Sequence, residues 1–302
     1  MAEPAHSPEL DPLARGALGA AVEVVRNAGL AVREPRVLSN EQNLIVHLGP
    51  SPVVARVATR IAWSRPDPEA WLAREVSVAG HAASHGGPVV APSSLVDPGP
   101  HRSGGFALTL WTYVEPTGRV PDAATTGEAL ARLHFSLEDF PDALPHRLPV
   151  HAQIEDALTA LERHEVLEEG TLAALRERHE ETAEELSRID GTPGVLHGDA
   201  HPWNLLQVSG EWRWIDLEET GYGPREWDLA VLAGKVERPE EGLSAYASVA
   251  GTPMPGPEVL RPFQRARELE TVAWAFGMAE HDPGGYREFA RDRLAKLLGD
   301  AS

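Results

Sequence analysis

The sequence contains no cysteine among its 302 residues. Disulfide bonds, a thiolate nucleophile and cysteine-ligated zinc are therefore excluded. It also lacks an apolar run of the roughly 18 residues that a membrane-spanning helix needs. Residues 1–11 are acidic and contain proline, without the apolar segment that is typical of a secretory signal. We therefore expect a cytoplasmic protein without a membrane partner.

Lysine is scarce, because only Lys235 and Lys296 accompany 25 arginines. Basic residues are also outnumbered, 27 against 46 acidic ones, which gives a net charge of −19. Such a field repels polyanions, so we expect no nucleic-acid partner. The acidity is uneven, with a net charge of −1 over residues 1–110 and −18 over residues 111–302. The acidic second part is expected to favour a cationic ligand.

The predicted secondary structure changes character along the chain. The first third combines helices at 11–28 and 67–84 with strand patterns at 37–38, 44–48, 53–57 and 106–114. The remainder is predicted to be mainly helical, with helices at 125–137, 152–167, 172–189, 226–236, 258–280 and 286–298. This order predicts an α+β protein with two lobes that join near residues 111–118.

The residues best suited to catalysis lie between the predicted helices, at 195–206. Asp199 and Asn204 stand five residues apart on a predicted loop, and a short apolar strand at 212–215 then leads to Asp216. Phosphoryl transfer needs a carboxylate that orients or accepts the proton of the attacking hydroxyl, and oxygen ligands that hold Mg²⁺ on the phosphates. We therefore expect Asp199 to be the catalytic base and Asn204 and Asp216 to bind Mg²⁺.

As a spaced set, these residues resemble the aminoglycoside phosphotransferase and choline-kinase-like family. The similar positions are His197-Gly198-Asp199, Asn204, Ile215-Asp216, Gly223 and Asp228-Leu229-Ala230, preceded by Leu130-Ala131-Arg132-Leu133-His134 on a helix. The likeness is dense over roughly residues 128–232. It implies the bilobal protein-kinase-like fold, with a small strand-rich nucleotide-binding lobe at 1–110, a hinge at 111–118 and a larger helical lobe for catalysis and acceptor binding at 119–302.

The resemblance also implies roles for residues around the base. Asp228 would fix the catalytic loop from inside, and His197 would be a buried scaffold residue that hydrogen-bonds the backbone. The cation that binds the nucleotide phosphates would come from the first lobe, which has no lysine. Arg56 lies within an apolar strand pattern and is the expected cation. Glu75 on the following helix is its expected partner, because an isolated buried charge is costly.

The expected nucleotide loop, residues 38–44, contains no glycine. Kinases use glycine there because it lets the backbone approach the phosphates. Ser39 and Asn43 are expected to donate side-chain hydrogen bonds instead. The hinge would bind the purine through the backbone of Thr112 and Val114. ATP is the expected phosphate donor and GTP the alternative.

The acceptor is expected to be a small molecule with a hydroxyl group. The acidic second part favours an amine-bearing acceptor, such as an antibiotic or an amino sugar. Glu218 and Glu219 follow Asp216 directly, and Glu270 and Trp274 lie on a late helix. These four residues are the candidates for acceptor binding. The sequence identifies no protein partner.

Two other functions fit part of the sequence. His197, Asp199 and His201 form an H-x-D-x-H cluster that could bind zinc or a dinuclear centre in a metal-dependent hydrolase. A non-catalytic nucleotide-binding protein on the same fold would explain the glycine-free loop. It would not need Asp199, because a binding module requires no base.

Overall fold

The chain divides into two compact units, which are described separately. The computed structural model describes residues 10–63, 67–146, 152–189, 191–280 and 285–299. The first unit contains the described residues of Met1–Ala62, Asp67–Ala73 and Pro92–Tyr113, and the second contains those of Trp63–Pro66, Arg74–Ala91 and Val114–Ser302. The division after Tyr113 falls within the predicted hinge at 111–118. The predicted limits of the lobes stay a prediction.

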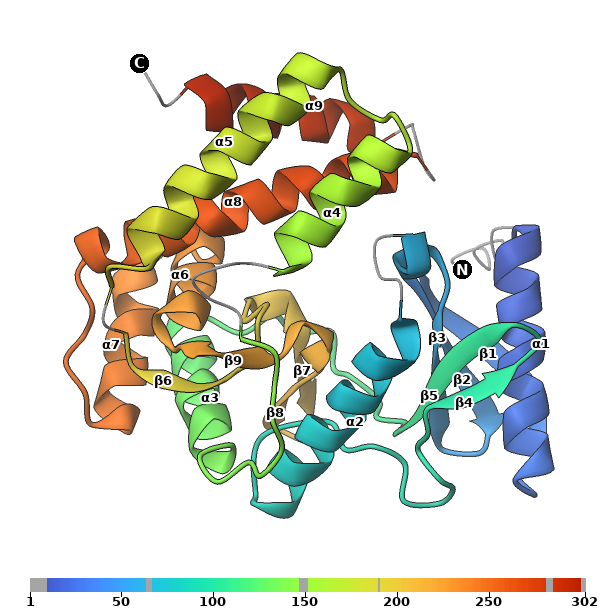
Figure 1. Ribbon diagram of the computed structural model, residues 1–302. Helices are drawn as coiled ribbons and strands as arrows, with labels where there is room; N and C mark the ends of the chain where they lie inside the picture. Colours follow the sequence, from blue (N-terminus) through green and yellow to red (C-terminus); the bar gives the residue numbers. More distant parts are fainter. Residues whose placement is uncertain (1–9, 64–66, 147–151, 190, 281–284, 300–302) are drawn as a thin grey trace, which may run out of the picture. The chain divides into compact units, whose positions relative to one another are not determined.

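The first unit is built on an antiparallel sheet with the strand order β1-β2-β3-β5-β4 (Figure 1). The strands are β1 (Val32–Asn40), β2 (Asn43–Pro50), β3 (Val53–Ala58), β4 (His101–Ser103) and β5 (Phe106–Thr112). Helix α1 (Pro12–Asn27) packs against this sheet. It begins where Asp11 accepts a hydrogen bond from the amide of Ala14 at 2.7 Å, and proline follows at the first helical position.

The core of the first unit lies between α1 and the sheet. Small side chains of the helix, including Ala14, Ala17 and Ala21, are fully buried against Val46, Leu110 and their neighbours on the strands. Alanine at these positions lets the helix axis approach the sheet closely. This packing supports β3, the strand that carries Arg56.

The second unit is mainly helical. It contains the later part of α2 (Pro68–Ser84), then α3 (Ala123–Ser136), α4 (Ala152–Arg163), α5 (Glu169–Leu186), α6 (Glu226–Lys235), α7 (Pro239–Ala250), α8 (Pro257–Ala279) and α9 (Tyr286–Gly299). Helix α8 contacts α4, α5, α6 and α9 (Figure 1). Its apolar face is buried in a core that includes Leu269, Val272 and Phe276.

Two small antiparallel strand pairs also belong to the second unit. Strand β6 (Pro193–Leu196) pairs with β9 (Gly221–Pro224), and β7 (Leu205–Val208) pairs with β8 (Glu211–Trp214). The first pair brings the start of the predicted catalytic loop beside the segment that follows Asp216. The second is a hairpin that connects Asn204 to Asp216.

The α+β prediction, with a strand-rich first part and a helical second part, is confirmed. The expected helices are present within a few residues of their predicted limits, whereas α7 and the strands β4, β6, β7 and β9 had not been predicted. In the described ranges, no helix is both long and apolar enough to cross a membrane.

Candidate active site

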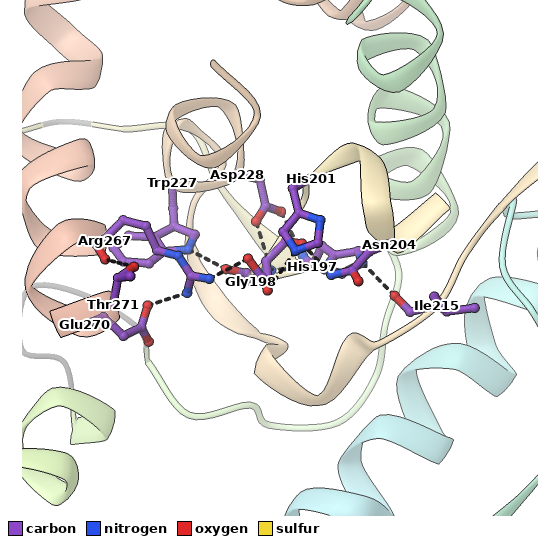
Figure 2. A network of polar contacts seen from close by, with 11 residues as sticks. His197, Gly198, His201, Asn204, Ile215, Trp227, Asp228, Arg267, Glu270 and Thr271 are labelled. Atoms are coloured by element: carbon purple, nitrogen blue, oxygen red, sulfur yellow. Dashed lines mark hydrogen bonds and ion pairs between the residues drawn. The ribbon is translucent and has the colours of Figure 1, made fainter. Parts of the chain in front are cut away.

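Asp228 anchors the loop that carries the predicted base. Its Oδ2 accepts a hydrogen bond from the amide of His197 at 2.7 Å, and its Oδ1 accepts one from the amide of Gly198 at 2.8 Å (Figure 2). His134 of α3 donates to Oδ2 at 2.9 Å. Burial raises the pKa of Asp228, but these donors outweigh it and hold the pKa below its usual value. The buried carboxylate is therefore ionised and fixes the loop backbone.

Gly198 is required where the loop turns. Its φ is +92°, a conformation that side-chain-bearing residues rarely adopt, and a Cβ atom there would lie 2.1 Å from the carbonyl oxygen of Glu219. The indole N–H of Trp227 donates to the Gly198 carbonyl at 2.8 Å. The close backbone approach and these hydrogen bonds define the direction in which the next residue, Asp199, leaves the loop.

His197 connects this loop to the end of β8. Its Nδ1 accepts a hydrogen bond from the amide of Asp199 at 3.3 Å, so Nε2 carries the proton and donates to the carbonyl of Ile215 at 3.1 Å. The ring is fully buried and packs edge-on against Trp214, and burial lowers its pKa. The imidazole is therefore neutral, and both of its nitrogens are used by the backbone.

The Asp199 carboxylate lies between a guanidinium and an imidazole. Oδ1 contacts Nη2 of Arg267 at 2.5 Å, and Oδ2 lies 3.3 Å from Nε2 of His201. Burial raises the pKa of Asp199, but the charge of Arg267 and the hydrogen bond from His201 outweigh it, and the pKa lies well below its usual value. The carboxylate is thus ionised, and its side chain is 20% exposed, so a bound hydroxyl can reach it.

Asn204 and Asp216 fit the oxygen chemistry of a magnesium site. The amide nitrogen of Asn204 donates to the carbonyl of Asp199 at 3.0 Å, which leaves the side-chain oxygen as the group available to a cation. The backbone of Asn204 accepts a hydrogen bond from Ile215 at 2.9 Å, directly before Asp216. Asp216 has φ +65° and ψ +53°, a left-handed conformation that is uncommon outside glycine. Mg²⁺ commonly takes one or two protein oxygens and completes its shell with phosphate and water.

The metal-dependent hydrolase is not supported. No group of three or more histidine, aspartate and glutamate side chains in the part of the chain that the structure describes could hold a metal ion. The ring nitrogens of His197 are both engaged by the backbone. The residues of the H-x-D-x-H motif therefore stabilise the conformation of a loop and do not form a metal centre.

The predicted acceptor residues lie on two segments of the second unit. Glu218 is buried in the short helical turn Leu217–Glu219 that follows Asp216. Glu270 lies one turn after Arg267 on α8 and pairs with its Nη1 at 2.6 Å. Trp274, one turn further along α8, packs edge-on against Tyr286. Their contact with an acceptor stays a prediction, as does that of Glu219.

The predicted nucleotide residues of the first unit lie on β1, β2, β3 and β5. Ser39 and Asn43 flank the glycine-free turn between β1 and β2. This turn is held by the segment after β3, since the carbonyl of Gln42 accepts hydrogen bonds from the Thr59 hydroxyl at 2.9 Å and the Ile61 amide at 3.0 Å.

The predicted ion pair and purine contacts involve residues of both units. Arg56 is buried on β3 of the first unit, and Glu75 is buried on the part of α2 that belongs to the second. Thr112 ends β5 in the first unit, and Val114 belongs to the second. The pairing of Arg56 with Glu75 and the purine contacts of Thr112 and Val114 stay predictions.

The principal contact of the predicted base, Arg267, had not been predicted from the sequence. Arg267 is 68 residues away from Asp199 in the chain and lies in a helix among other charged residues. No local motif marks it, because its importance arises only from the packing of α8 in the second unit. Of the three residues His134, Trp227 and Asp228, only Trp227 was absent from the residues singled out in the sequence. Nothing in the sequence indicates that its indole donates a hydrogen bond to the loop.

A family model described as "Phosphotransferase enzyme family" matches residues 27–263. Among solved structures, an amicoumacin kinase in complex with AMP-PNP, Ca²⁺ and Ami is 14% identical, with a TM-score of 0.70 over 92% of this chain and 93% of that one. Choline kinase LicA from Streptococcus pneumoniae is 15% identical, with a TM-score of 0.67 over 93% and 99%.

A third similar structure is the GDP and kanamycin complex of APH(2")-IIia, with 15% identity and a TM-score of 0.64 over 93% of this chain and 98% of that one. These likenesses confirm the predicted fold of kinases. No curated protein matches the sequence significantly.

Proposed function

Because the chain belongs to the phosphotransferase enzyme family, we propose that it transfers the γ-phosphate of ATP, held with Mg²⁺, to a hydroxyl group of a small molecule. One observation carries the proposal. The hydrogen bonds of His197 and Asn204 bring the ends of one loop and one hairpin together, so that Asp199, Asn204 and Asp216 project from one connected backbone network. These are the side chains that phosphoryl transfer requires.

Asp199 is the group that handles the acceptor. Its ionised carboxylate accepts a hydrogen bond from the acceptor hydroxyl, which orients the oxygen toward the phosphorus. The hydroxyl proton passes to Asp199 as the new O–P bond forms and the bond to the β-phosphate oxygen breaks. Asn204 and Asp216 would hold the metal, and Mg²⁺ when bound supplies positive charge that neutralises the transferring phosphoryl group.

The nucleotide side of the proposal rests on the first unit. Arg56 would contact the phosphates and pair with Glu75, and both side chains are buried. Ser39 and Asn43 would donate hydrogen bonds in the turn that lacks glycine. The backbone of Thr112 and Val114 would bind the purine of ATP. Arg56→Ala should then raise the KM for the nucleotide and lower kcat together.

We place an amine-bearing molecule first among the acceptors. The supporting observation is the net charge of −18 over residues 111–302, which concentrates cations near the surface of the second unit. Glu218, Glu219, Glu270 and Trp274 are the proposed contacts. If the acceptor is a cation, its KM should rise with ionic strength as exposed carboxylates are screened. A KM that is independent of salt would contradict an electrostatic contribution to acceptor binding.

The test is transfer of radiolabelled γ-phosphate from Mg·ATP to a panel of kanamycin, spectinomycin, choline and ethanolamine, with sugars as uncharged members. Asp199→Asn should lower kcat by about a hundredfold or more while nucleotide affinity changes little, because the carboxylate acts mainly in the transition state. The matched control is Asp292→Asn on α9, which removes an exposed carboxylate. Transfer by Asp199→Asn at the rate of the parent protein would overturn the assignment.

A further inference from the structure

Arg267 and the loop that carries the base belong to different parts of the second unit. It lies on α8, where Ala266, Leu269 and Val272 are almost fully buried and fix the helix in its core. The guanidinium of Arg267 reaches out of this helix toward the loop of His197 and Gly198 (Figure 2). Its Nη2 contacts Oδ1 of Asp199 at 2.5 Å. The position of the base therefore depends on α8, which follows the catalytic loop and the hairpin in the chain.

The guanidinium is itself held in place. Nη1 donates to Oε2 of Glu270 at 2.6 Å, while Nη2 donates to Asp199, so the planar group bridges two carboxylates. The side chains of Arg267 and Glu270 are 20% and 12% exposed, which keeps solvent from competing freely for them. Arginine suits this position because its donors form a rigid fork, whereas a lysine ammonium would be a single point charge.

Asp199 is fixed at both oxygens as a result. Arg267 holds Oδ1, and Nε2 of His201 lies 3.3 Å from Oδ2. The terminal torsion of an aspartate is otherwise broad, and a carboxylate that rotates freely spends little time in the geometry needed for transfer. Phosphoryl transfer relies on positioning more than on base strength, so the gain in order outweighs the loss of basicity beside a cation.

We propose that Arg267 is a positioning residue for the phosphoryl transfer, which holds the Asp199 carboxylate in the orientation that receives the acceptor hydroxyl. Glu270 supports it by fixing the other end of the guanidinium. This inference rests on the proposed function. It gives Glu270 a role through Arg267, in addition to the acceptor contact proposed above.

The test compares Arg267→Met with Arg265→Met, an arginine two residues earlier on α8 that pairs with the exposed Glu185. The assay is hydrolysis of Mg·ATP without an added acceptor, where water takes the place of the hydroxyl. Loss of positioning should lower kcat of Arg267→Met by about 10- to 100-fold with the KM for Mg·ATP nearly unchanged. Arg267→Lys should be intermediate, and Arg265→Met should resemble the parent protein.

Two further measurements distinguish a loss of positioning from a general loss of structure in the active site. Guanidinium chloride at low millimolar concentration should restore part of the kcat of Arg267→Met but none of that of Asp199→Asn. In addition, Arg267→Met should cause little further loss on the Asp199→Asn background, because residues that act through one group are not additive. A full additional loss on that background, or a kcat of Arg267→Met equal to that of the parent, would overturn the inference.

A measurement without turnover keeps this inference distinct from the proposed function. Urea unfolding of the parent, the two single variants and the double variant gives the coupling between Asp199 and Arg267. A partly buried ion pair predicts that the two substitutions change the unfolding equilibrium constant non-additively, by about fivefold or more. If the protein transfers no phosphate but this coupling is present, the proposed function fails and the ion pair stands. Independent effects would overturn the pairing whatever the activity.

Discussion

The imidazole of His197 donates a hydrogen bond to the carbonyl of Ile215 at 3.1 Å and accepts one from the amide of Asp199 at 3.3 Å. A single neutral ring therefore connects the residue before Asp216 to Asp199, the proposed base. The distance between the proposed metal ligand and the proposed base depends on this ring, although phosphoryl transfer itself requires no imidazole.

Replacing this ring should affect stability and activity together. His197→Ala removes two hydrogen bonds and the contact with Trp214, so we expect the free energy of unfolding to fall by about 3 kcal/mol. Urea unfolding measures this change, and phosphoryl transfer should fall in the fraction that remains folded. The control is His85→Ala, which replaces an exposed residue directly after α2. A stability of His197→Ala within about 0.5 kcal/mol of the parent would contradict the role of the ring.

Glycine at position 198 can be tested against a glycine with similar backbone geometry. Gly198 and Gly210 have φ of +92° and +89°, but only Gly198 has backbone atoms within contact distance of an added Cβ. Gly210→Ala should therefore cost about 1 kcal/mol from the backbone conformation alone. Gly198→Ala should cost clearly more and lower kcat, because the loop must move away from Glu219. Equal effects of the two substitutions on unfolding would show that the close approach is unimportant.

The ionised Asp228 predicts a pH dependence of stability. Its pKa is lower in the folded protein than in the unfolded chain, so its stabilising effect is complete above about pH 5 and is lost as the pH falls toward the folded-state pKa. Asp228→Asn should be less stable at pH 7, and its stability should fall less than that of the parent between pH 7 and pH 3. Urea unfolding at both pH values measures the difference. Asp292→Asn, the surface control, should follow the parent.

Helix α3, which carries His134, has a cap that can be removed. Asp122 accepts a hydrogen bond from the amide of Thr125 at 2.8 Å, whereas Glu168 at the start of α5 makes no such side-chain bond. Asp122→Ala should lower the free energy of unfolding by about 1 kcal/mol, and Glu168→Ala should change it by much less. Thermal or urea unfolding compares the pair. A larger loss in Glu168→Ala would contradict the capping assignment.

The proposed metal ligands differ in charge, which predicts a graded loss of binding. Asp216→Ala should abolish the Mg²⁺-dependent part of ATP affinity, and Asn204→Ala should weaken it less because a neutral amide supplies less charge than a carboxylate. Titration calorimetry with ATP, with and without Mg²⁺, measures this part directly. Addition of EDTA to the parent protein should reproduce the Asp216→Ala result. Parent-like Mg·ATP binding in both variants would place the metal ligands elsewhere.

The features that the sequence predicted well are those set by local patterns. Helix α1 has an aspartate cap, a proline at its first position and a regular apolar face, and its predicted and observed limits nearly coincide. The placement of Asp199 and Asn204 on one loop and of Asp216 after a short strand was also predicted, whereas their catalytic and metal-binding roles stay predictions. In both cases the preferences of the local sequence agree with the local structure that forms.

The features that the sequence missed depend on tertiary packing or on very short elements. Strands β6 and β9 have four residues each and contain glycine and proline, so their sequences resemble those of loops. Helix α7 begins at Pro239 with two glutamates in its first turn, and these signals were available but overlooked. Arg267 could not be found in this way, because only the fold brings α8 to Asp199.

The segment matched by the family model ends at residue 263, inside α8, and Arg267 lies one turn beyond it. The predicted base thus lies inside the family segment, and its principal ionic contact lies beyond it. If Arg267 positions Asp199 as proposed, a substitution on α8 would alter how the acceptor hydroxyl is bound without any change in the predicted catalytic loop. An expression fragment trimmed to the family segment would retain every predicted catalytic and metal-binding residue and still lose Arg267, the arginine proposed to orient Asp199.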